Sequence, residues 1–149
     1  MIVRVRVHTE SVSPEHRYCR FMALLTEAEM NDFADRLLAA IGAADEVALR
    51  EVYDPQAAVW HNFDERDQTV DENLAMLHDM HRRLQGFQYT EVRRALTADG
   101  FVQQHVLVGQ AMGGALRMPA MIRFYVANGR ITRLEEYLDT RQAMVMYQA

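Results

Sequence analysis

Residues 128–139 have the sequence Asn-Gly-Arg-Ile-Thr-Arg-Leu-Glu-Glu-Tyr-Leu-Asp, which predicts a tight turn followed by a strand. Asn-Gly is a preferred dipeptide for a two-residue hairpin turn. In the strand after it, alternate side chains lie on opposite faces. The two faces carry, in turn, Leu134, Glu136 and Leu138, and Arg133, Glu135 and Tyr137. The stretch therefore predicts half of a hairpin, with one carboxylate among leucines on one face.

Three more candidate strands precede this one, over residues 87–96, 101–110 and 117–126. Ala98-Asp99-Gly100 and Met112-Gly113-Gly114 separate them. Short connections that contain Asp-Gly or Gly-Gly are typical of β-hairpins. We therefore predict an antiparallel meander that ends at Asp139, and a last turn of helix in the tail from Thr140.

Two capping boxes predict helix starts on the N-terminal side of the meander. Thr26 with Glu29 and Thr69 with Glu72 each have the spacing of a threonine cap and a glutamate that closes it. Apolar residues follow each box at helical spacing, and each run ends at a glycine. Both segments are therefore expected to be helices with one apolar face.

Between these helices we expect a short helix from Asp45 and a short strand over residues 57–62. Asp54-Pro55 stops the helix, because a residue before proline avoids the helical region. The resulting order is helices, strand, helix and then meander. That order is typical of α+β architecture, with helices packed on one face of an antiparallel sheet. A strongly curved sheet would leave a conical pocket between the two layers.

Length and composition fit one domain with its own core. The chain has 149 residues, of which 50% are hydrophobic. We expect residues 22–149 to form the domain and residues 1–21 to be an N-terminal extension or an edge strand. The net charge of −5 argues against nucleic acid as a partner, because phosphate binding needs a basic surface. No stretch is apolar enough to suggest a membrane partner.

Cysteine and histidine usage bears on location and on metal binding. Cys19 is the single cysteine, so an internal disulfide and a cysteine zinc site are excluded, and a cytoplasmic protein is expected. His78 and His81 lie one helical turn apart, but no third ligand follows at metal spacing. We therefore expect no metal.

Three segments carry a resemblance to a known family: Val59-Trp60-His61-Asn62, residues 101–107 (Phe-Val-Gln-Gln-His-Val-Leu) and residues 128–139. In these, the chain resembles the nuclear transport factor 2-like superfamily, especially its SnoaL-like, ketosteroid isomerase-like and limonene epoxide hydrolase-like members. The resemblance covers residues 22–139. It implies a cone-shaped fold (a cystatin-like α+β barrel), a small apolar organic ligand, no cofactor, and a homodimer formed through the outer sheet face.

The resemblance suggests site residues position by position. Asn62 lies where ketosteroid isomerases have an aspartate base and where limonene epoxide hydrolases have an asparagine that holds water. Gln103 and His105 lie where those hydrolases have an arginine and an aspartate, and Glu136 lies where they have a second aspartate. An amide cannot act as a base, so neither family's complete catalytic set is present. The catalytic candidates are Asn62, His105 and Glu136.

The chemistry of these residues leaves two interpretations open. A carboxylate on an apolar face must be paired, hydrogen-bonded or shifted in pKa, so Glu136 is either a structural acid or an acid–base group. His105 is either a core residue or a general base. Of the neighbours His61 and Asn62, which point to opposite faces, we expect Asn62 to line the pocket.

The hairpin register decides what faces Glu136. A two-residue Asn128-Gly129 turn places Met121 opposite Glu136 and Arg123 close enough to pair with it. A bulge at Gly129 instead places an apolar wall there, made of Ala120, Ile122 and Phe124. We favour the bulge. The expected substrate-binding residues are Tyr53, Trp60, Gln103, Ile122, Phe124, Leu134 and Leu138.

The sequence therefore supports two functional hypotheses. The first is a cofactor-independent enzyme that performs acid–base chemistry, such as hydration, epoxide opening, isomerisation or cyclisation, on a polyketide-, terpene- or steroid-like substrate. The second is a non-catalytic ligand-binding or dimerisation module of the same fold. Either one is expected to dimerise, with Arg133, Glu135 and Tyr137 at the rim of the interface.

Overall fold

The computed structural model describes residues 26–148. The predicted N-terminal extension or edge strand, residues 1–21, lies outside these residues. Three helices come early in the chain: α1 (Glu27–Ala43), α2 (Glu46–Val52) and α3 (Val70–Arg83). The tail forms the predicted last turn, α4 (Thr140–Ala143), followed by the 3-10 helix η2 (Met144–Met146).

Both predicted capping boxes are present. The backbone N–H of Glu29 donates to Thr26 Oγ1 (3.2 Å), and the N–H of Thr26 donates to the Glu29 carboxylate (2.8 Å). Thr69 and Glu72 make the same reciprocal pair at the start of α3. Each cap supplies partners for backbone N–H groups that the first helical turn leaves unpaired. The short-range signals therefore predicted both helix starts correctly.

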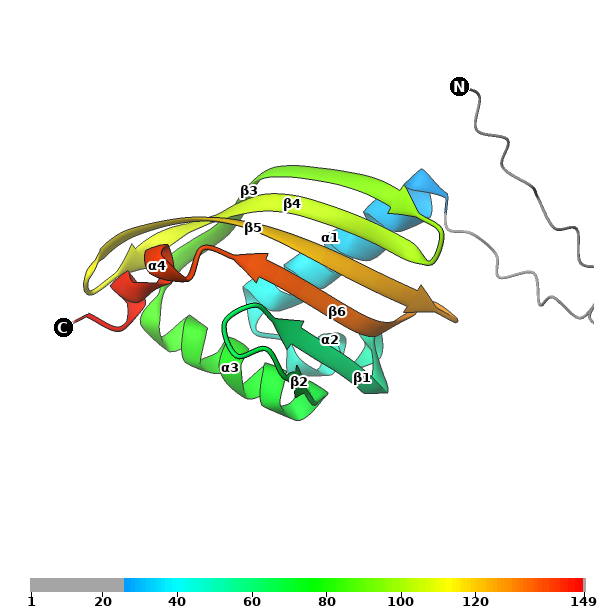
Figure 1. Cartoon of the computed structure of the whole chain (residues 1–149), viewed down its shortest axis with the longest axis horizontal. Helices are drawn as coiled ribbons and strands as arrows, with labels where there is room; N and C mark the ends of the chain where they lie inside the picture. Colours follow the sequence, from blue (N-terminus) through cyan, green and yellow to red (C-terminus); the bar gives the residue numbers. More distant parts are fainter. Residues whose placement is uncertain (1–25, 149) are drawn as a thin grey trace, which may run out of the picture.

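The sheet has six strands in the order β2-β1-β6-β5-β4-β3. Their bounds are β1 (Tyr53–His61), β2 (Asp67–Gln68), β3 (Gln85–Thr97), β4 (Gly100–Ala111), β5 (Gly114–Ala127) and β6 (Arg130–Leu138). β3 to β6 form the predicted antiparallel meander, and β1 pairs in parallel with β6. The helices lie on one face of this curved sheet, whose edges stay open (Figure 1).

The β5–β6 hairpin combines features of both predicted registers. Asn128 (φ 53°) and Gly129 (φ 73°) form a two-residue turn, since Ala127 pairs with Arg130. One extra residue, Thr132, then interrupts the ladder, because the next pairs are Val126 with Ile131 and Tyr125 with Arg133. The bulge predicted at Gly129 is therefore three residues further on. Beyond it the chain follows the register that we favoured.

This register decides the surroundings of Glu136. Ile122 pairs with Glu136, whereas Met121 pairs with Tyr137. The Arg123 side chain lies on the opposite face of β5 and donates a hydrogen bond to Asp99. Arg123 therefore does not neutralise Glu136, and the alternative that paired them is wrong. Register shifts in β1, β3 and β6 also contribute to the sheet's curvature, since bulges bend strands.

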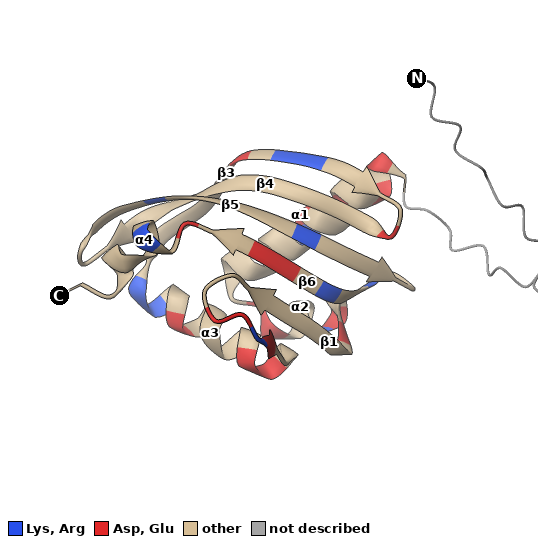
Figure 2. Ribbon diagram, viewed as in Figure 1, with Lys and Arg blue, Asp and Glu red and all other residues tan. Residues whose placement is uncertain are grey.

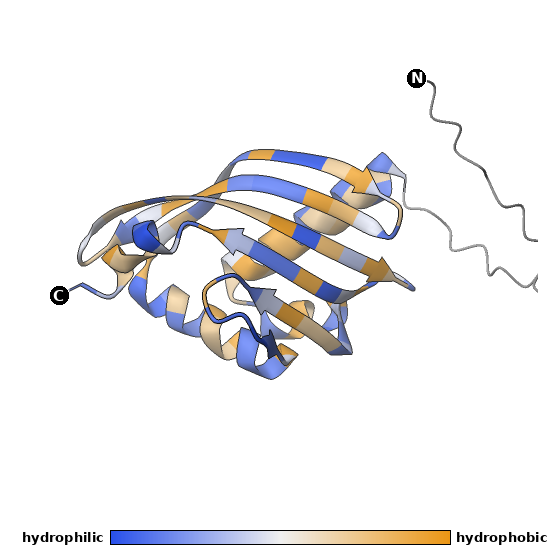
Figure 3. Ribbon diagram, viewed as in Figure 1, coloured by the Kyte–Doolittle hydropathy of each residue, from blue (hydrophilic) through white to orange (hydrophobic). Residues whose placement is uncertain are grey.

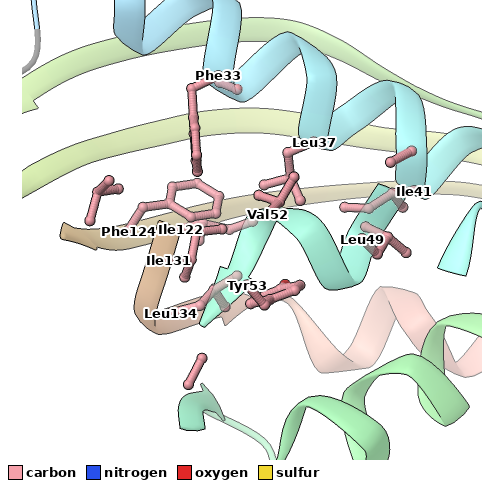
Figure 4. Close-up of a cluster of buried hydrophobic side chains, with 14 of the residues drawn as sticks. Phe33, Leu37, Ile41, Leu49, Val52, Tyr53, Ile122, Phe124, Ile131 and Leu134 are labelled. Atoms are coloured by element: carbon pink, nitrogen blue, oxygen red, sulfur yellow. The ribbon is translucent and has the colours of Figure 1, made fainter. Parts of the chain in front are cut away.

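The main core lies between α1, α2 and the part of the sheet around Phe101, Phe124 and Ile131. We call this part of the sheet its first half. Phe101 and Phe124 stack with ring centroids 4.5 Å apart, and Phe33 of α1 meets Phe101 edge-on at 6.2 Å. Figure 4 shows Phe33 and Leu37 of α1 pointing from the helix toward the sheet residues Phe124 and Ile122. Such aromatic pairs add to the gain from burying their apolar area. This half of the molecule is filled with side chains.

Hydrophobic and hydrophilic residues alternate along the strands, as β5 shows (Figure 3). Charged residues lie along β3, β5 and β6 (Figure 2), and Arg123, Arg133 and Glu135 project from the sheet face away from the helices. Arg133 pairs with Asp67 (2.9 Å) and Glu135 (2.7 Å) on this face. Within residues 26–148, no helix has both the length and the apolarity needed to cross a membrane.

Candidate active site

A cavity of about 270 Å³ lies on the helix side of the sheet, next to α3 and the C-terminal segment. We call this part of the sheet its second half. Side chains from β1, β3 to β6, α3 and the C-terminal segment surround the cavity. The polar lining residues are His61, Tyr89, His105, Glu136, Thr140 and Tyr147. The others are Phe63, Met76, Leu77, Met80, Leu107, Met118, Leu138, Ala143, Met144 and Met146. Methionine is flexible and polarisable, so such a lining adapts to apolar ligands of different shape.

Glu136 and His61 lie next to each other at the wall of this cavity. Glu136 Oε2 is 3.3 Å from His61 Nε2, and the two side chains are 17% and 2% exposed. Parallel pairing of β1 with β6 sets this contact, because His61 and Glu136 are register partners. The His61 ring also stacks on Phe63, with centroids 4.9 Å apart. The carboxylate therefore has a buried imidazole beside it in largely apolar surroundings.

His105 projects from β4 into the same cavity. Only 4% of the residue is exposed. Burial lowers the pKa of the His105 imidazole, and the opposing effect of nearby Glu136 is smaller. Gln103, two residues earlier on the same face, places its Nε2 3.3 Å from His105 Nδ1. His105 is therefore a neutral imidazole near neutral pH.

Tyr89 of β3 completes the polar wall, and its ring meets His105 edge-on at 4.9 Å. Burial raises the pKa of the Tyr89 hydroxyl, and the charge of Glu136 raises it further. The hydroxyl therefore keeps its proton and is a hydrogen-bond donor. The wall around Glu136 thus combines one carboxylate with an imidazole beside it, a second imidazole and the Tyr89 phenol, and Thr140 and Tyr147 are the other polar lining residues of the cavity.

Sequence reasoning missed His61 and Tyr89. The buried positions of β1 are Tyr53, Ala57, Val59 and His61. The small apolar residues Ala57 and Val59 are therefore the sequence signal that marks the inner face. From the sequence we instead predict that the face with Trp60 and Asn62 lines the pocket. Tyr89 carries no comparable signal, because only the fold brings the start of β3 opposite the end of β6.

The structure places Asn62 and Trp60 away from the cavity, contrary to prediction. The Asn62 side chain accepts from the Leu138 N–H (3.2 Å) and donates to the Leu138 carbonyl (3.0 Å). This pair of bonds ties the loop after β1 to β6. Trp60 packs against Tyr137, with ring centroids 5.2 Å apart, on the sheet face away from the helices. Both residues lie one position out of phase with the inner face.

Most of the other expected substrate-binding residues belong to the packed core. Tyr53, Ile122, Phe124 and Leu134 are all in the main core cluster. Burial raises the pKa of Tyr53, which is 2% exposed. Gln103 is completely buried behind His105. Of the seven, Leu138 alone lines the cavity, because the first half of the inner face packs against α1 and α2.

Residues 26–148 contain no group of three or more His, Cys, Asp or Glu side chains arranged to hold a metal ion. His78 lies 4.0 Å from Glu46, and His81 bonds the Ile41 carbonyl at 2.6 Å. The two histidines therefore have separate partners.

The six-strand curved sheet, the early helices and the cavity under the meander define the nuclear transport factor 2-like fold. The chain has this fold, as the resemblance predicted. No protein-family model matches the sequence, and no curated protein matches it either.

Solved structures give the closer comparison. IdmH, a candidate polyketide cyclase from Streptomyces antibioticus, is 17% identical with a TM-score of 0.70, and the match covers 80% of this chain and 98% of IdmH. A candidate SnoaL-like polyketide cyclase from Shewanella denitrificans is 13% identical (TM-score 0.68; 80% and 96% covered). A candidate isomerase from Bacillus subtilis is 14% identical (TM-score 0.69; 83% and 96% covered). At these identities the likeness shows the fold.

Proposed function

We propose that this protein is an enzyme that performs acid–base chemistry on a small, largely apolar organic molecule bound in the cavity. One observation carries the proposal: the Glu136 carboxylate lies 3.3 Å from buried His61 inside an apolar cavity that also holds His105 and Tyr89. Ionisable groups gathered in a mostly apolar cavity are typical of catalytic sites. The reaction needs no metal or organic cofactor.

Glu136 is the proposed base. A carboxylate in apolar surroundings is weakly hydrated, and His61 beside it orients the carboxyl group. It would take a proton from a carbon next to a carbonyl group and return that proton elsewhere on the substrate. His105 and Tyr89 lie on the same wall and would stabilise the oxygen on which charge develops.

Isomerisation or cyclisation fits this arrangement better than epoxide opening. Limonene epoxide hydrolases hold the attacking water with an asparagine at the position that Asn62 resembles. Here the Asn62 amide bonds the Leu138 backbone and lies away from the cavity. The candidate cyclases and the candidate isomerase among the similar structures support the same choice. Drug-sized pockets measure about 300–1,000 Å³, so this cavity favours a smaller polyketide-, terpene- or steroid-related substrate.

The test is to screen the protein against β-keto esters, enones and epoxides, and then to compare two carboxamide variants. Glu136→Gln should lower turnover about 100-fold while the ligand still binds. Glu135→Gln is the matched control, because the neighbouring carboxylate lies on the other face, bonded to Arg133 and Tyr125. Its turnover should stay within about twofold. Full turnover by Glu136→Gln would contradict the proposal.

A non-catalytic ligand-binding module is the second candidate. It is favoured by the absence of both families' complete catalytic sets, since Asn62 replaces the isomerase aspartate and Gln103 replaces the hydrolase arginine. This candidate predicts saturable ligand binding with no product for any member of the panel. Binding without product would select it over the enzyme.

We also propose a homodimer formed through the sheet face away from the helices, in a cytoplasmic protein. Tyr137 (51% exposed) and Met121 (39% exposed) leave apolar surface there, next to the charged residues Arg133 and Glu135. The lone Cys19 supports a reducing compartment. Light scattering at micromolar concentration should give twice the chain mass, and a monodisperse monomer would contradict the dimer.

A further inference from the structure

A chain of hydrogen bonds connects α1 to the cavity through Arg94 and Gln103. Arg94 of β3 donates to Asp35 (2.7 Å) and Asn31 (3.1 Å), both on α1. Its Nε donates to Gln103 Oε1 at 2.8 Å. The Arg94 side chain is only 9% exposed, although it carries a charge. These contacts hold a guanidinium group against the back of the polar wall.

Arg94 determines which way the Gln103 amide points. A guanidinium group has donors and no acceptor, so the amide atom that meets it must be the oxygen. The Gln103 NH₂ group is then directed at His105 Nδ1, 3.3 Å away. An NH₂ group can only donate, so Nδ1 must accept and carries no proton.

The proton of neutral His105 is therefore on Nε2. The Nε2 atom has no hydrogen bond to residues 26–148, and the imidazole lines the cavity. Protonating Nδ1 as well would place two donors face to face, close to the Arg94 charge. The network thus favours a single protonation state, in which His105 presents an N–H group to a ligand.

We infer that Arg94 and Gln103 are positioning residues that hold His105 as the Nε2–H tautomer, a hydrogen-bond donor to a substrate oxygen. His105 then does not act as the base, and Glu136 is the proton acceptor. With the Tyr89 hydroxyl, the site offers two neutral donors, which suits a carbonyl oxygen that becomes an enolate. The catalytic part of this inference depends on the proposed function, whereas the tautomer does not.

The tautomer is measured directly from the ¹⁵N shifts of the His105 ring in the ligand-free protein at pH 8. The native protein should show Nε2–H. Gln103→Glu keeps the bond from Arg94 but presents a carboxylate to Nδ1, so it should move a proton to Nδ1. Gln104→Glu is the matched control, because Gln104 is exposed on the other face of β4. It should leave the spectrum unchanged.

Arg94→Leu tests the same chain without placing a carboxylate in the core. The Gln103 amide is then free to turn over, so His105 should show both tautomers, whereas Arg93→Leu on the exposed face should not change it. An Nδ1–H tautomer in the native protein, or an unchanged Nε2–H signal in both Gln103→Glu and Arg94→Leu, would overturn the inference.

Turnover separates this inference from the proposed function. Gln103→Glu should lower kcat about 100-fold with a smaller change in KM, as for the loss of one donor to a developing oxyanion, and Gln104→Glu should match the native protein. If the shifts are as expected and no substrate in the panel reacts, the proposed function fails and the tautomer assignment stands. Full activity in a Gln103→Glu protein whose tautomer has switched would overturn the catalytic part.

Discussion

The two halves of the inner sheet face have the same strands but different contents. In the first half, Phe101 of β4 and Phe124 of β5 stack in a filled core under α1 and α2. In the second half, His105 and Met118 of the same strands line a cavity of about 270 Å³ beside α3 and the tail. Phe101 and His105 are four residues apart on β4, yet Phe101 packs in the core and His105 is a candidate catalytic group.

The difference shows how one sheet separates stability from chemistry. Large rings that interlock at one end hold the strands in register. The other end is then able to carry Glu136, His61 and His105, which cost stability when buried. Four comparisons test this division, from the largest expected effect to the smallest.

Truncation should distinguish the two halves most strongly. Phe124→Ala leaves a large cavity in a fully buried cluster, so the free energy of unfolding should fall by about 3–5 kcal/mol. Met76→Ala removes a flexible, partly exposed cavity residue and should cost roughly 1 kcal/mol. Urea unfolding of both variants measures the difference. Equal losses would mean that the two halves are equally packed.

Adding atoms should give the reverse comparison. Ala34→Leu overfills the core, where Ala34 is 1% exposed, and should cost about 1–3 kcal/mol. Ala143→Leu adds the same atoms to the cavity wall, so stability should change by less than about 1 kcal/mol. Its ligand affinity should decrease because the added atoms occupy ligand space. Unchanged affinity in a calorimetric titration would show that the ligand binds elsewhere.

Acid should act through the cavity half. The pKa of His105 is lowered in the folded state, mainly by burial, so below about pH 6.5 the unfolded chain gains a proton that the folded protein does not. The free energy of unfolding should therefore fall as pH drops from about 6.5 toward the folded pKa, by up to about 1.4 kcal/mol per pH unit from this residue.

His105→Gln should remove this part of the acid sensitivity. Urea unfolding gives the free energy of unfolding at pH 7.5 and at pH 5.5. The difference between these two free energies should be smaller in the variant than in the native protein. Equal pH dependence in the two proteins would show that His105 takes up a proton as readily when folded.

The outer face should contribute least. Arg117 and Glu91 form an ion pair of 2.6 Å with side chains 60% and 52% exposed. Water screens such pairs, so Arg117→Ala should change the free energy of unfolding by less than about 0.5 kcal/mol. Thermal unfolding of the variant beside Phe124→Ala makes the contrast visible. A loss comparable with that of the core variant would mean that this face is packed against a partner.

The sequence by itself determined the local structure. Capping boxes at Thr26 and Thr69 and the Asn128-Gly129 turn gave the right helix starts and the right hairpin, because their signals span only a few residues. Alternation around Glu136 also placed it on the inner face beside leucines. These features depend on neighbours in the chain and need no knowledge of the tertiary structure.

The tertiary structure alone decided which residues meet. Alternation gives two faces for β1 but not which one the helices cover, so His61 lines the cavity where Asn62 was expected. The β6 register favoured from sequence was right, but the extra residue that sets it is Thr132 and not Gly129. Tyr89 and the tail joined the site only because the sheet curves around it. Pairing and curvature are long-range properties, and no short window of sequence contains them.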